Sequence, residues 1–186
     1  SDLYEKFKTD FVRKTNALLV GDPLHMNTKM GAVISENHLN KILSYIDIAE
    51  KEGGTILCGG NPIKLNGNCK SGWFMSPTVI DGLENKCRVN QEEIFGPVVT
   101  LIPFSNNEEA LSIANDSQYG LSATVWTQDI EKAHRTAEQL ETGIIWINCW
   151  LVRDLRTPFG GMKSSGLGRE GGDEILRFFT EPKNIC

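Results

Sequence analysis

Long hydrophobic runs are missing from this sequence of 186 residues. No apolar stretch approaches the ~20 residues that a helix needs to span a bilayer, so we expect no membrane-spanning helix. Positive charge is also too sparse for a nucleic-acid-binding surface. The formal net charge is -5, and no basic stripe is interleaved with aromatic residues. We therefore expect neither a membrane nor nucleic acid among the partners.

Cysteines in a pairing pattern are also lacking. The five cysteines are odd in number and include no C-x-x-C pair, which disfavours both a disulfide framework and a zinc site. A reducing, cytoplasmic setting fits this usage best, and we expect no bound metal. Cys149 follows a predicted strand, where a nucleophile can sit. No histidine near it in the sequence suggests a base, however, and a small buried thiol is the commoner case.

The two ends of the sequence are abrupt. Ser1 and Asp2 lead directly into a helical pattern, without an initiator methionine or a preceding strand, and residues 183–186 stop as if inside a strand. We therefore expect the chain to be an excerpt from a larger protein. Its own length suits one domain that buries roughly 70% of the surface of the unfolded chain.

The spacing of apolar residues predicts alternating strands and helices. Helices are expected where apolar residues recur every three or four positions, and strands where short apolar runs end at turn residues. The predicted helices are 3–18, 35–52, 107–115, 129–141 and 173–179, and the predicted strands are 55–58, 73–75, 78–80, 98–104, 121–126 and 144–147. Such alternation favours right-handed β-α-β units. We therefore predict an α/β fold with an open, mainly parallel sheet and helices on both faces.

The segment 150–163 carries two arginines in largely apolar surroundings. Arg153 and Arg156 lie three residues apart, and Phe159 follows them. Arginine keeps its charge and presents a planar fork of donors that matches a carboxylate, so burying it beside aromatic residues is costly unless an anion meets it. We predict that Arg153 meets the carboxylate of a small organic substrate. The open alternative is a salt bridge to Asp154 or a solvated turn.

Two adjacent carboxylates, Glu92 and Glu93, precede Phe95 and a Gly-Pro turn. An ionised glutamate offers acceptor oxygens for both hydroxyls of a ribose diol, and a nearby aromatic ring can pack on a flat heterocycle. This pattern favours a nucleotide site. The open alternative is a polar turn whose glutamates are solvated.

His38 is expected in the first turn of the second helix, three residues before Lys41. Their three-residue spacing makes both side chains project from one surface. Each is either a surface residue or a ligand-binding one. Further along, the glycine-rich segment 158–170 lacks the glycine spacing of a P-loop and of a dinucleotide fingerprint, so a tightly packed loop is expected there.

Several of these segments together resemble the C-terminal part of the NAD(P)-dependent aldehyde dehydrogenases. The resemblance covers essentially the whole chain and rests on separate motifs in the same order. These motifs are Glu92-Glu-Ile-Phe-Gly-Pro97, Asn115 with Tyr119-Gly-Leu121, Gly143 with Trp146-Ile-Asn148, Pro158-Phe-Gly-Gly161, Ser165-Gly166 and Gly168-Arg-Glu170. The segment 148–156 is most similar to the dehydrogenases that act on 2-aminomuconate or 2-hydroxymuconate semialdehyde. The resemblance implies an α/β catalytic domain over residues 1–179.

The resemblance also implies roles for the residues that match the family's motifs. Glu93 matches the carboxylate that holds the nicotinamide ribose of NAD, and Phe95 matches the ring beside the nicotinamide. His38 and Lys41 fall where the family places further cofactor contacts, although the family commonly has glutamine at the position of His38. No metal is implied.

On the substrate side, the implied roles concern the arginine-rich segment. Arg153 matches the residue that pairs with the substrate carboxylate in the muconic semialdehyde subgroup. Phe159 matches the aromatic residue that lines the aldehyde pocket, and Arg156 stays undecided. The implied substrate is thus a carboxylate-bearing semialdehyde. A general or retinal-type aldehyde dehydrogenase, in which Arg153 only makes a salt bridge, remains an alternative.

The family's catalytic residues have no match in these 186 residues. Its nucleophilic cysteine lies shortly before the position of Ser1, and its general-base glutamate, its oxyanion-stabilising asparagine and most of its dinucleotide-binding domain lie further upstream. The chain alone is therefore expected to be inactive. Residues 180–186 are expected to begin an edge strand that joins another subunit, because the family forms dimers and tetramers. An inactive, truncated isoform that serves as an assembly module is the remaining alternative.

Overall fold

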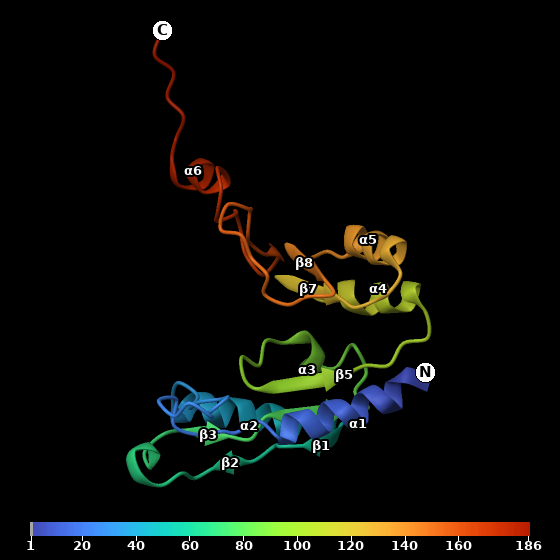
Figure 1. Cartoon of the computed structure of the whole chain (residues 1–186), viewed down its shortest axis with the longest axis vertical. Coiled ribbons are helices and arrows are strands. Elements are labelled where there is room, and N and C mark those ends of the chain that lie inside the picture. Colours follow the sequence, from blue (N-terminus) through green and yellow to red (C-terminus); the bar gives the residue numbers. More distant parts are fainter. Residues whose placement is uncertain (1) are drawn as a thin grey trace. The chain divides into compact units, whose positions relative to one another are not determined.

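The computed structural model describes residues 2–186, and only the backbone of Asp2 (Figure 1). The length of the sequence suits a single domain, but the chain divides into two compact units. The first unit ends at Phe104, and the second runs from Ser105 to Cys186. Each unit contains its own strands and helices.

Two helices open the first unit. They are α1 (Asp2–Asn16) and α2 (Glu36–Lys51). The side chain of Ser35 caps α2 by accepting a hydrogen bond from the backbone N–H of His38, 3.2 Å away. One face of α2 is buried and forms the core of the unit, as the four-residue spacing predicts: Leu39, Ile42, Ile46 and Ala49. Ser1, which precedes the first predicted helix, lies outside the described residues.

The sheet of the first unit has three strands in the order β1-β4-β5. These strands are β1 (Thr55–Cys58), β4 (Thr78–Asp81) and β5 (Val98–Leu101). Strand β4 is central and its first three residues are buried. It runs antiparallel to β1 and parallel to β5. The short strands β2 (Pro62–Ile63) and β3 (Phe74–Met75) form a separate antiparallel pair on either side of the 3-10 helix η1 (Gly67–Cys69). Between β4 and β5 lies the short helix α3 (Arg88–Gln91).

The first helix is fastened to the end of β4 by polar contacts. The hydroxyl of Tyr4 donates a hydrogen bond to the Asp81 carboxylate, and the Lys8 ammonium lies 3.0 Å from the same group. Burial and the hydrogen bond to Asp81 together raise the pKa of Tyr4 to about 12. The phenol therefore stays neutral and acts as a donor at physiological pH.

The second unit contains a β-α-β unit. Helix α4 (Asn107–Asn115) precedes β7 (Ser122–Val125), helix α5 (Ile130–Gln139) and β8 (Ile144–Ile147), and β7 pairs in parallel with β8. The side chains of Asn106 and Asp129 cap the two helices. The short strands β6 (Tyr119–Gly120) and β9 (Met162–Lys163) pair antiparallel, and α6 (Glu174–Phe179) follows.

The α/β class predicted from the sequence is confirmed, but the sheet arrangement differs from the prediction. In place of one open, mainly parallel sheet, the described residues form several small sheets in which antiparallel pairs are common. The connections explain the difference. Parallel pairing needs a crossover, and the chain supplies one with α3 between β4 and β5 and with α5 between β7 and β8. No α-helix separates β1 from β4, so β4 returns antiparallel.

The C-terminal segment 180–186 pairs with no other strand of the described chain. Thr180 caps the end of α6, and the residues after it have no ladder hydrogen bonds within residues 2–186. Its assignment as an edge strand that joins another subunit stays a prediction.

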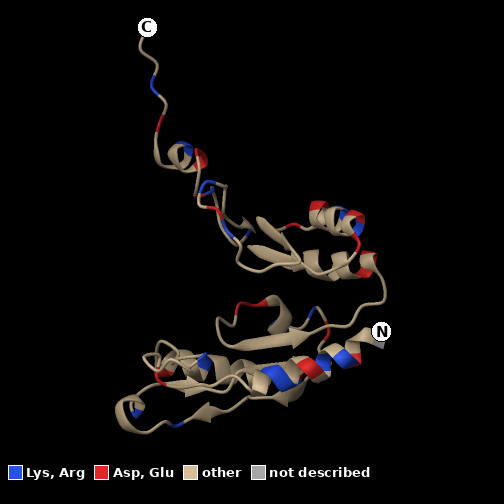
Figure 2. Ribbon diagram, in the orientation of Figure 1, with Lys and Arg blue, Asp and Glu red and all other residues tan. Residues whose placement is uncertain are grey.

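Helices α1, α2, α5 and α6 carry charges of both signs, whereas α4 carries only acidic side chains (Figure 2). Within the part of the chain that the structure describes, no helix is long and apolar enough to cross a membrane. Nor do three or more His, Cys, Asp or Glu side chains gather there in a way that could hold a metal ion.

Candidate functional site

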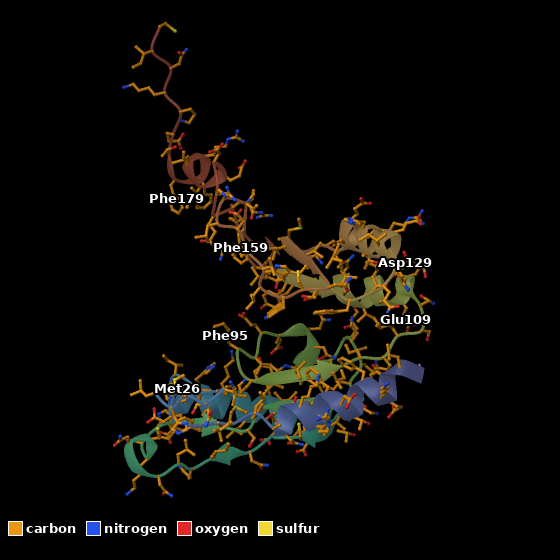
Figure 3. The ribbon with its side chains drawn as sticks, viewed as in Figure 1. Met26, Phe95, Glu109, Asp129, Phe159 and Phe179 are labelled. Carbon is orange, nitrogen blue, oxygen red and sulfur yellow. The ribbon has the colours of Figure 1, made fainter. Side chains whose placement is uncertain are left out.

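The first candidate site, in the first unit, is the 92–96 segment, the loop that joins α3 to β5 and carries the exposed ring of Phe95 (Figure 3). This segment runs directly over α2. A Cβ atom added at Gly96 would fall 2.6 Å from Cδ1 of Ile42, whose side chain is fully buried. Only glycine allows so close an approach. Phe95 has a φ of +59°, a left-handed conformation that is costly for an aromatic residue.

Two side chains of α2 bond to the main chain of this segment. Nε2 of His38 lies 2.6 Å from the carbonyl oxygen of Phe95, and the ammonium of Lys41 donates to the carbonyl oxygen of Glu93 over 3.1 Å. The His38 ring also packs edge-on near the Phe95 ring, with centroids 6.1 Å apart. The structure thus brings together all four residues predicted for the cofactor. Their roles toward a cofactor stay a prediction.

Glu92 is held by two partners that the sequence analysis missed. The hydroxyl of Tyr45 donates to Glu92 over 2.6 Å, and Arg88 donates two hydrogen bonds to the carboxylate, at 2.8 and 2.9 Å. The bonds from Arg88, and next the one from Tyr45, lower the pKa of Glu92 to about 2. The alternative of two solvated glutamates is therefore wrong for Glu92. The four-residue spacing of Arg88 and Glu92 on a helix was the available signal.

The carboxylate of Glu93 is differently placed. It is exposed, and no side chain or backbone group among residues 2–186 bonds to it. The Phe95 ring is 73% exposed. A carboxylate with free acceptor oxygens beside an uncovered aromatic ring suits a ribose diol followed by a flat heterocycle. The residues present therefore fit the nicotinamide-ribose end of NAD.

A second candidate site belongs to the other unit and centres on Arg153. Its guanidinium donates to the Glu170 carboxylate over 2.7 Å and stacks 4.0 Å from the centroid of the Phe159 ring. About a third of its side chain is exposed. The alternative salt bridge from Arg153 to Asp154 is wrong, because Asp154 pairs with Arg156 instead. The anion that meets Arg153 in the free chain is an internal one, Glu170.

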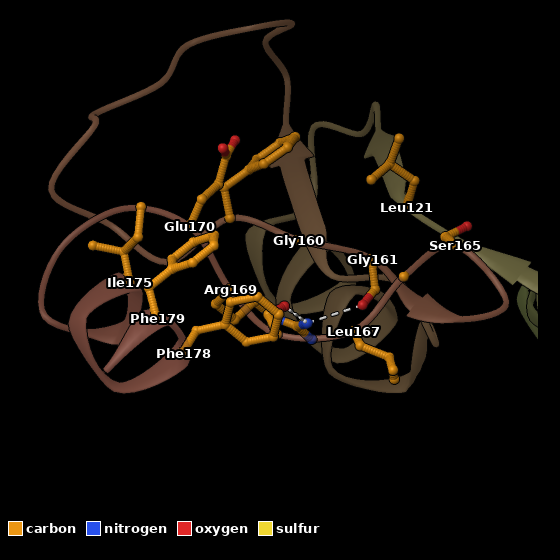
Figure 4. Close-up of a pocket in the computed structure, with 13 residues that line it drawn as sticks. Leu121, Gly160, Gly161, Ser165, Leu167, Arg169, Glu170, Ile175, Phe178 and Phe179 are labelled. Carbon is orange, nitrogen blue, oxygen red and sulfur yellow. Dashed lines mark hydrogen bonds between the residues drawn. The ribbon is translucent and has the colours of Figure 1, made fainter. Parts of the chain in front are cut away.

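The loop around Phe159 holds Glu170 in place. Phe159 and Glu170 form an antiparallel bridge with backbone N···O distances of 2.7 and 2.8 Å. A Cβ atom on Gly143 would lie 1.6 Å from the carbonyl oxygen of Gly160, so this loop packs against the start of β8 with no room for a side chain. The prediction of a tightly packed glycine-rich loop is confirmed. Arg169 ties the loop further by donating to the carbonyl of Gly161 over 2.9 Å (Figure 4).

A cavity of about 440 Å³ lies between this loop and α6 (Figure 4). Phe159 and Glu170 line it from the loop, and Phe178 and Phe179 line it from α6. Its wall is mostly apolar, with the Arg169 and Glu170 side chains as the charged groups. The predicted pocket aromatic Phe159 therefore faces an open space beside the ion pair of Arg153 and Glu170.

The five cysteines are all free thiols. None of the five forms a disulfide. Burial raises the pKa of the Cys58 and Cys87 thiols, which keeps both protonated and weakly nucleophilic. Cys149 is partly buried after β8.

Comparison with known proteins gives a consistent result. Residues 1–185 match the model of the aldehyde dehydrogenase family. The chain is 46% identical over 185 residues to 2-aminomuconic semialdehyde dehydrogenase of Mus musculus, and 44% identical over 184 residues to 2-aminomuconic 6-semialdehyde dehydrogenase of a Pseudomonas species. These alignments cover 98% and 99% of the chain, but the chain spans only 38% of the length of either relative.

Solved structures show the same likeness. Betaine aldehyde dehydrogenase of Staphylococcus aureus, in complex with NAD+, is 40% identical with a TM-score of 0.90, covering 96% of this chain and 35% of that one. HpcC of Thermus thermophilus is 41% identical with a TM-score of 0.91, covering all of this chain and 38% of that one.

Proposed function

Because the chain belongs to the aldehyde dehydrogenase family, we propose that it is the part of an NAD-dependent aldehyde dehydrogenase that grips the nicotinamide ribose and lines one wall of the substrate pocket. The whole enzyme would oxidise an aldehyde to a carboxylic acid. The observation that carries the proposal is the Glu93 carboxylate, which is exposed and has no bonding partner among the described residues, two residues before the uncovered Phe95 ring.

The cofactor supplies the hydride acceptor when bound, and the residues of this chain supply its orientation. Glu93 accepts hydrogen bonds from the ribose hydroxyls. Phe95 offers an apolar face to the nicotinamide side of the cofactor and keeps water from it. His38 and Lys41 bond to the main chain of the 92–96 segment from α2, so they belong to the same site.

We further propose that the substrate is a carboxylate-bearing semialdehyde such as 2-aminomuconic semialdehyde. Arg153 binds its carboxylate, and Phe159 packs against its carbon chain. The likeness to 2-aminomuconic and 2-hydroxymuconic semialdehyde dehydrogenases supports this choice. So does the position of Arg153, whose guanidinium stacks on the ring of Phe159, 4.0 Å from its centroid.

The experiment that tests the substrate proposal compares two arginines in the whole enzyme. Arg153→Ala should lower kcat/KM for a carboxylate-bearing aldehyde by roughly 30-fold or more, because a charge-assisted contact is lost. It should leave kcat/KM for a neutral aldehyde nearly unchanged. Arg156→Ala is the matched control, since Arg156 also pairs with an acid and is largely exposed. Equal losses for both aldehydes would contradict the assignment of Arg153.

The rival function is a general aldehyde dehydrogenase in which Arg153 is only a structural residue. The observation that favours it is the internal ion pair with Glu170, which already satisfies the charge of Arg153. The same comparison of aldehydes decides between the two functions.

For the assembly we propose a homo-oligomer, a dimer or a tetramer, in a cytoplasmic setting. The segment 180–186, which has no strand partner within the described chain, would add to a sheet of another subunit. The free cysteines are consistent with a reducing compartment. Light scattering of the whole enzyme, with and without residues 180–186, measures the contribution of this segment. An unchanged mass after deletion would argue against it.

A further inference from the structure

We propose that α2 acts as a brace that holds the 92–96 segment in a ligand-ready shape, with Tyr45, Lys41 and His38 as positioning residues for Glu93 and Phe95. The inference deepens the proposed function and rests on it. It assigns His38 and Lys41 a different task from the direct cofactor contact that the family resemblance implies. It also brings in Tyr45, to which neither the sequence motifs nor the comparisons give a role.

The three side chains lie along one face of α2. Their spacing of three and then four residues places them one above the other on the helix. They bond to three successive points of the segment. Tyr45 reaches the Glu92 side chain at 2.6 Å, Lys41 the Glu93 carbonyl at 3.1 Å, and His38 the Phe95 carbonyl at 2.6 Å.

Packing closes the space between helix and segment. Ile42 lies on the same face of α2 and fills the room that a side chain at position 96 would need. Two cations lie near the Tyr45 ring. The Lys41 ammonium is 5.9 Å and the Arg88 guanidinium 6.0 Å from the ring centroid. Arg88 in turn holds the other side of the Glu92 carboxylate. The brace thus combines hydrogen bonds, charge and close packing.

The brace leaves one group unbound. Glu93 has its carbonyl fixed by Lys41 and its preceding neighbour fixed by Tyr45 and Arg88, yet its own carboxylate has no partner among residues 2–186. A ligand that binds this carboxylate meets a backbone whose freedom is already restricted, so less entropy is lost on binding. The bond from His38 acts in the same way on Phe95, whose left-handed backbone would otherwise relax.

The test removes one hydroxyl and keeps the ring. Tyr45→Phe breaks the bond to Glu92 while preserving the stacking with Lys41 and Arg88. In the whole enzyme we expect the Kd and KM for NAD+ to rise about fivefold, the size of one such hydrogen bond. The KM for the aldehyde should stay unchanged. Tyr4→Phe is the matched control, because Tyr4 also donates to a carboxylate in the first unit but lies on α1, away from the segment. Equal losses of NAD+ affinity in the two variants would overturn the inference.

A second background shows whether Tyr45 acts through Glu93. If it does, the effect of Tyr45→Phe on the Kd for NAD+ should vanish when Glu93 is already alanine, since coupled residues do not add. If Tyr45→Phe still raises the Kd for NAD+ fivefold when Glu93 is alanine, the positioning role is overturned, but the proposed ribose contact of Glu93 is not. An unchanged Kd for Glu93→Ala by itself would instead overturn the proposed ribose contact, and the positioning role with it.

A readout that needs no cofactor completes the test. The N–H of Glu92 donates to the carbonyl of Arg88 over 2.8 Å, so its exchange reports on the start of the segment. Amide hydrogen exchange of Glu92 in the 186-residue chain should speed up about fivefold in Tyr45→Phe and stay at the wild-type rate in Tyr4→Phe. Unchanged exchange in Tyr45→Phe would contradict the brace.

Discussion

Glu93 in the first unit and Arg153 in the second are the two charged groups proposed to bind ligands. They differ in whether the charged group has a partner within the chain. Glu93 is surrounded by contacts to its neighbours, while its own carboxylate has no partner among the described residues. Arg153 has both an anion and an aromatic platform in Glu170 and Phe159. The first group is therefore ready for a ligand, and the second must exchange one carboxylate for another.

The strength of the ion pair makes this exchange feasible. The side chains of Arg153 and Glu170 are 34% and 54% exposed, and exposed ion pairs contribute only about 0–1 kcal/mol because water and salt screen them. A substrate carboxylate can thus compete with Glu170 at modest cost. The pair keeps Arg153 oriented in the free chain without locking it.

The largest expected effect concerns the backbone that supports the Arg153 site. Gly143→Ala places a methyl group against the carbonyl of Gly160, so either β8 or the loop must move. Overpacking against backbone should lower the free energy of unfolding by about 3 kcal/mol or more. Thermal unfolding followed by circular dichroism measures this change. An unfolding temperature equal to that of the wild type would show that the loop is not tightly packed there.

The corresponding glycine-to-alanine change in the 92–96 segment should lower the free energy of unfolding by less. Gly96→Ala meets the Ile42 side chain at Cδ1, Cγ1 and Cγ2 and no backbone atom, so a side chain must shift and the main chain need not. The free energy of unfolding should fall by about 1–3 kcal/mol. Gly31→Ala is the control, because its nearest atom outside the local chain is 3.8 Å away and its backbone is unstrained. A larger loss for Gly96→Ala than for Gly143→Ala would reverse the comparison of the two regions.

A smaller effect is expected from the counter-ion of Arg153. Glu170→Gln removes the competing charge and should lower the KM for a carboxylate-bearing aldehyde by up to about fivefold in the whole enzyme. The KM for a neutral aldehyde should not change. Steady-state kinetics at two salt concentrations test this, since salt weakens the pair already in the wild type. An unaltered KM ratio would show that Glu170 does not compete with the substrate.

The smallest effect is a pH dependence of stability from Glu92. Its pKa falls from an ordinary 4.5 to about 2 in the folded chain, mainly through Arg88. Between these values the unfolded state binds more protons, so the stabilisation is complete above pH 4.5 and is lost as the pH falls towards 2. Urea unfolding across this range should show a shallower decline for Glu92→Gln. Glu93→Gln, measured alongside, controls for the loss of one negative charge. Equal slopes for Glu92→Gln and the wild type would contradict this role.

Local patterns predicted the helices well. Helix α4 has the predicted bounds, and Ser35 precedes α2 with the buried face that the apolar spacing predicts. These features depend on residues within a few positions of one another. The strands β6 and β9 were missed because each has two residues and pairs across more than forty positions of sequence.

The candidate site residues, like the helices, were predicted from the sequence only in part. Family motifs indicated the residues on the 92–96 segment, and the structure shows that His38 and Lys41 reach it from α2. The partner of Arg153 was not predictable from spacing, because Glu170 is 17 residues away and arrives through the folding of the glycine-rich loop. Asp154 is adjacent in sequence but turns to Arg156 instead.

The conformation of Phe95 has a consequence for attempts to engineer or evolve this chain. Selection for heat resistance alone would favour glycine at position 95, because glycine adopts a φ of +59° freely and removes an uncovered ring from water. Selection for turnover would favour the aromatic residue under the proposed function. Position 95 is therefore where a screen for thermal tolerance and a screen for catalysis should enrich different amino acids.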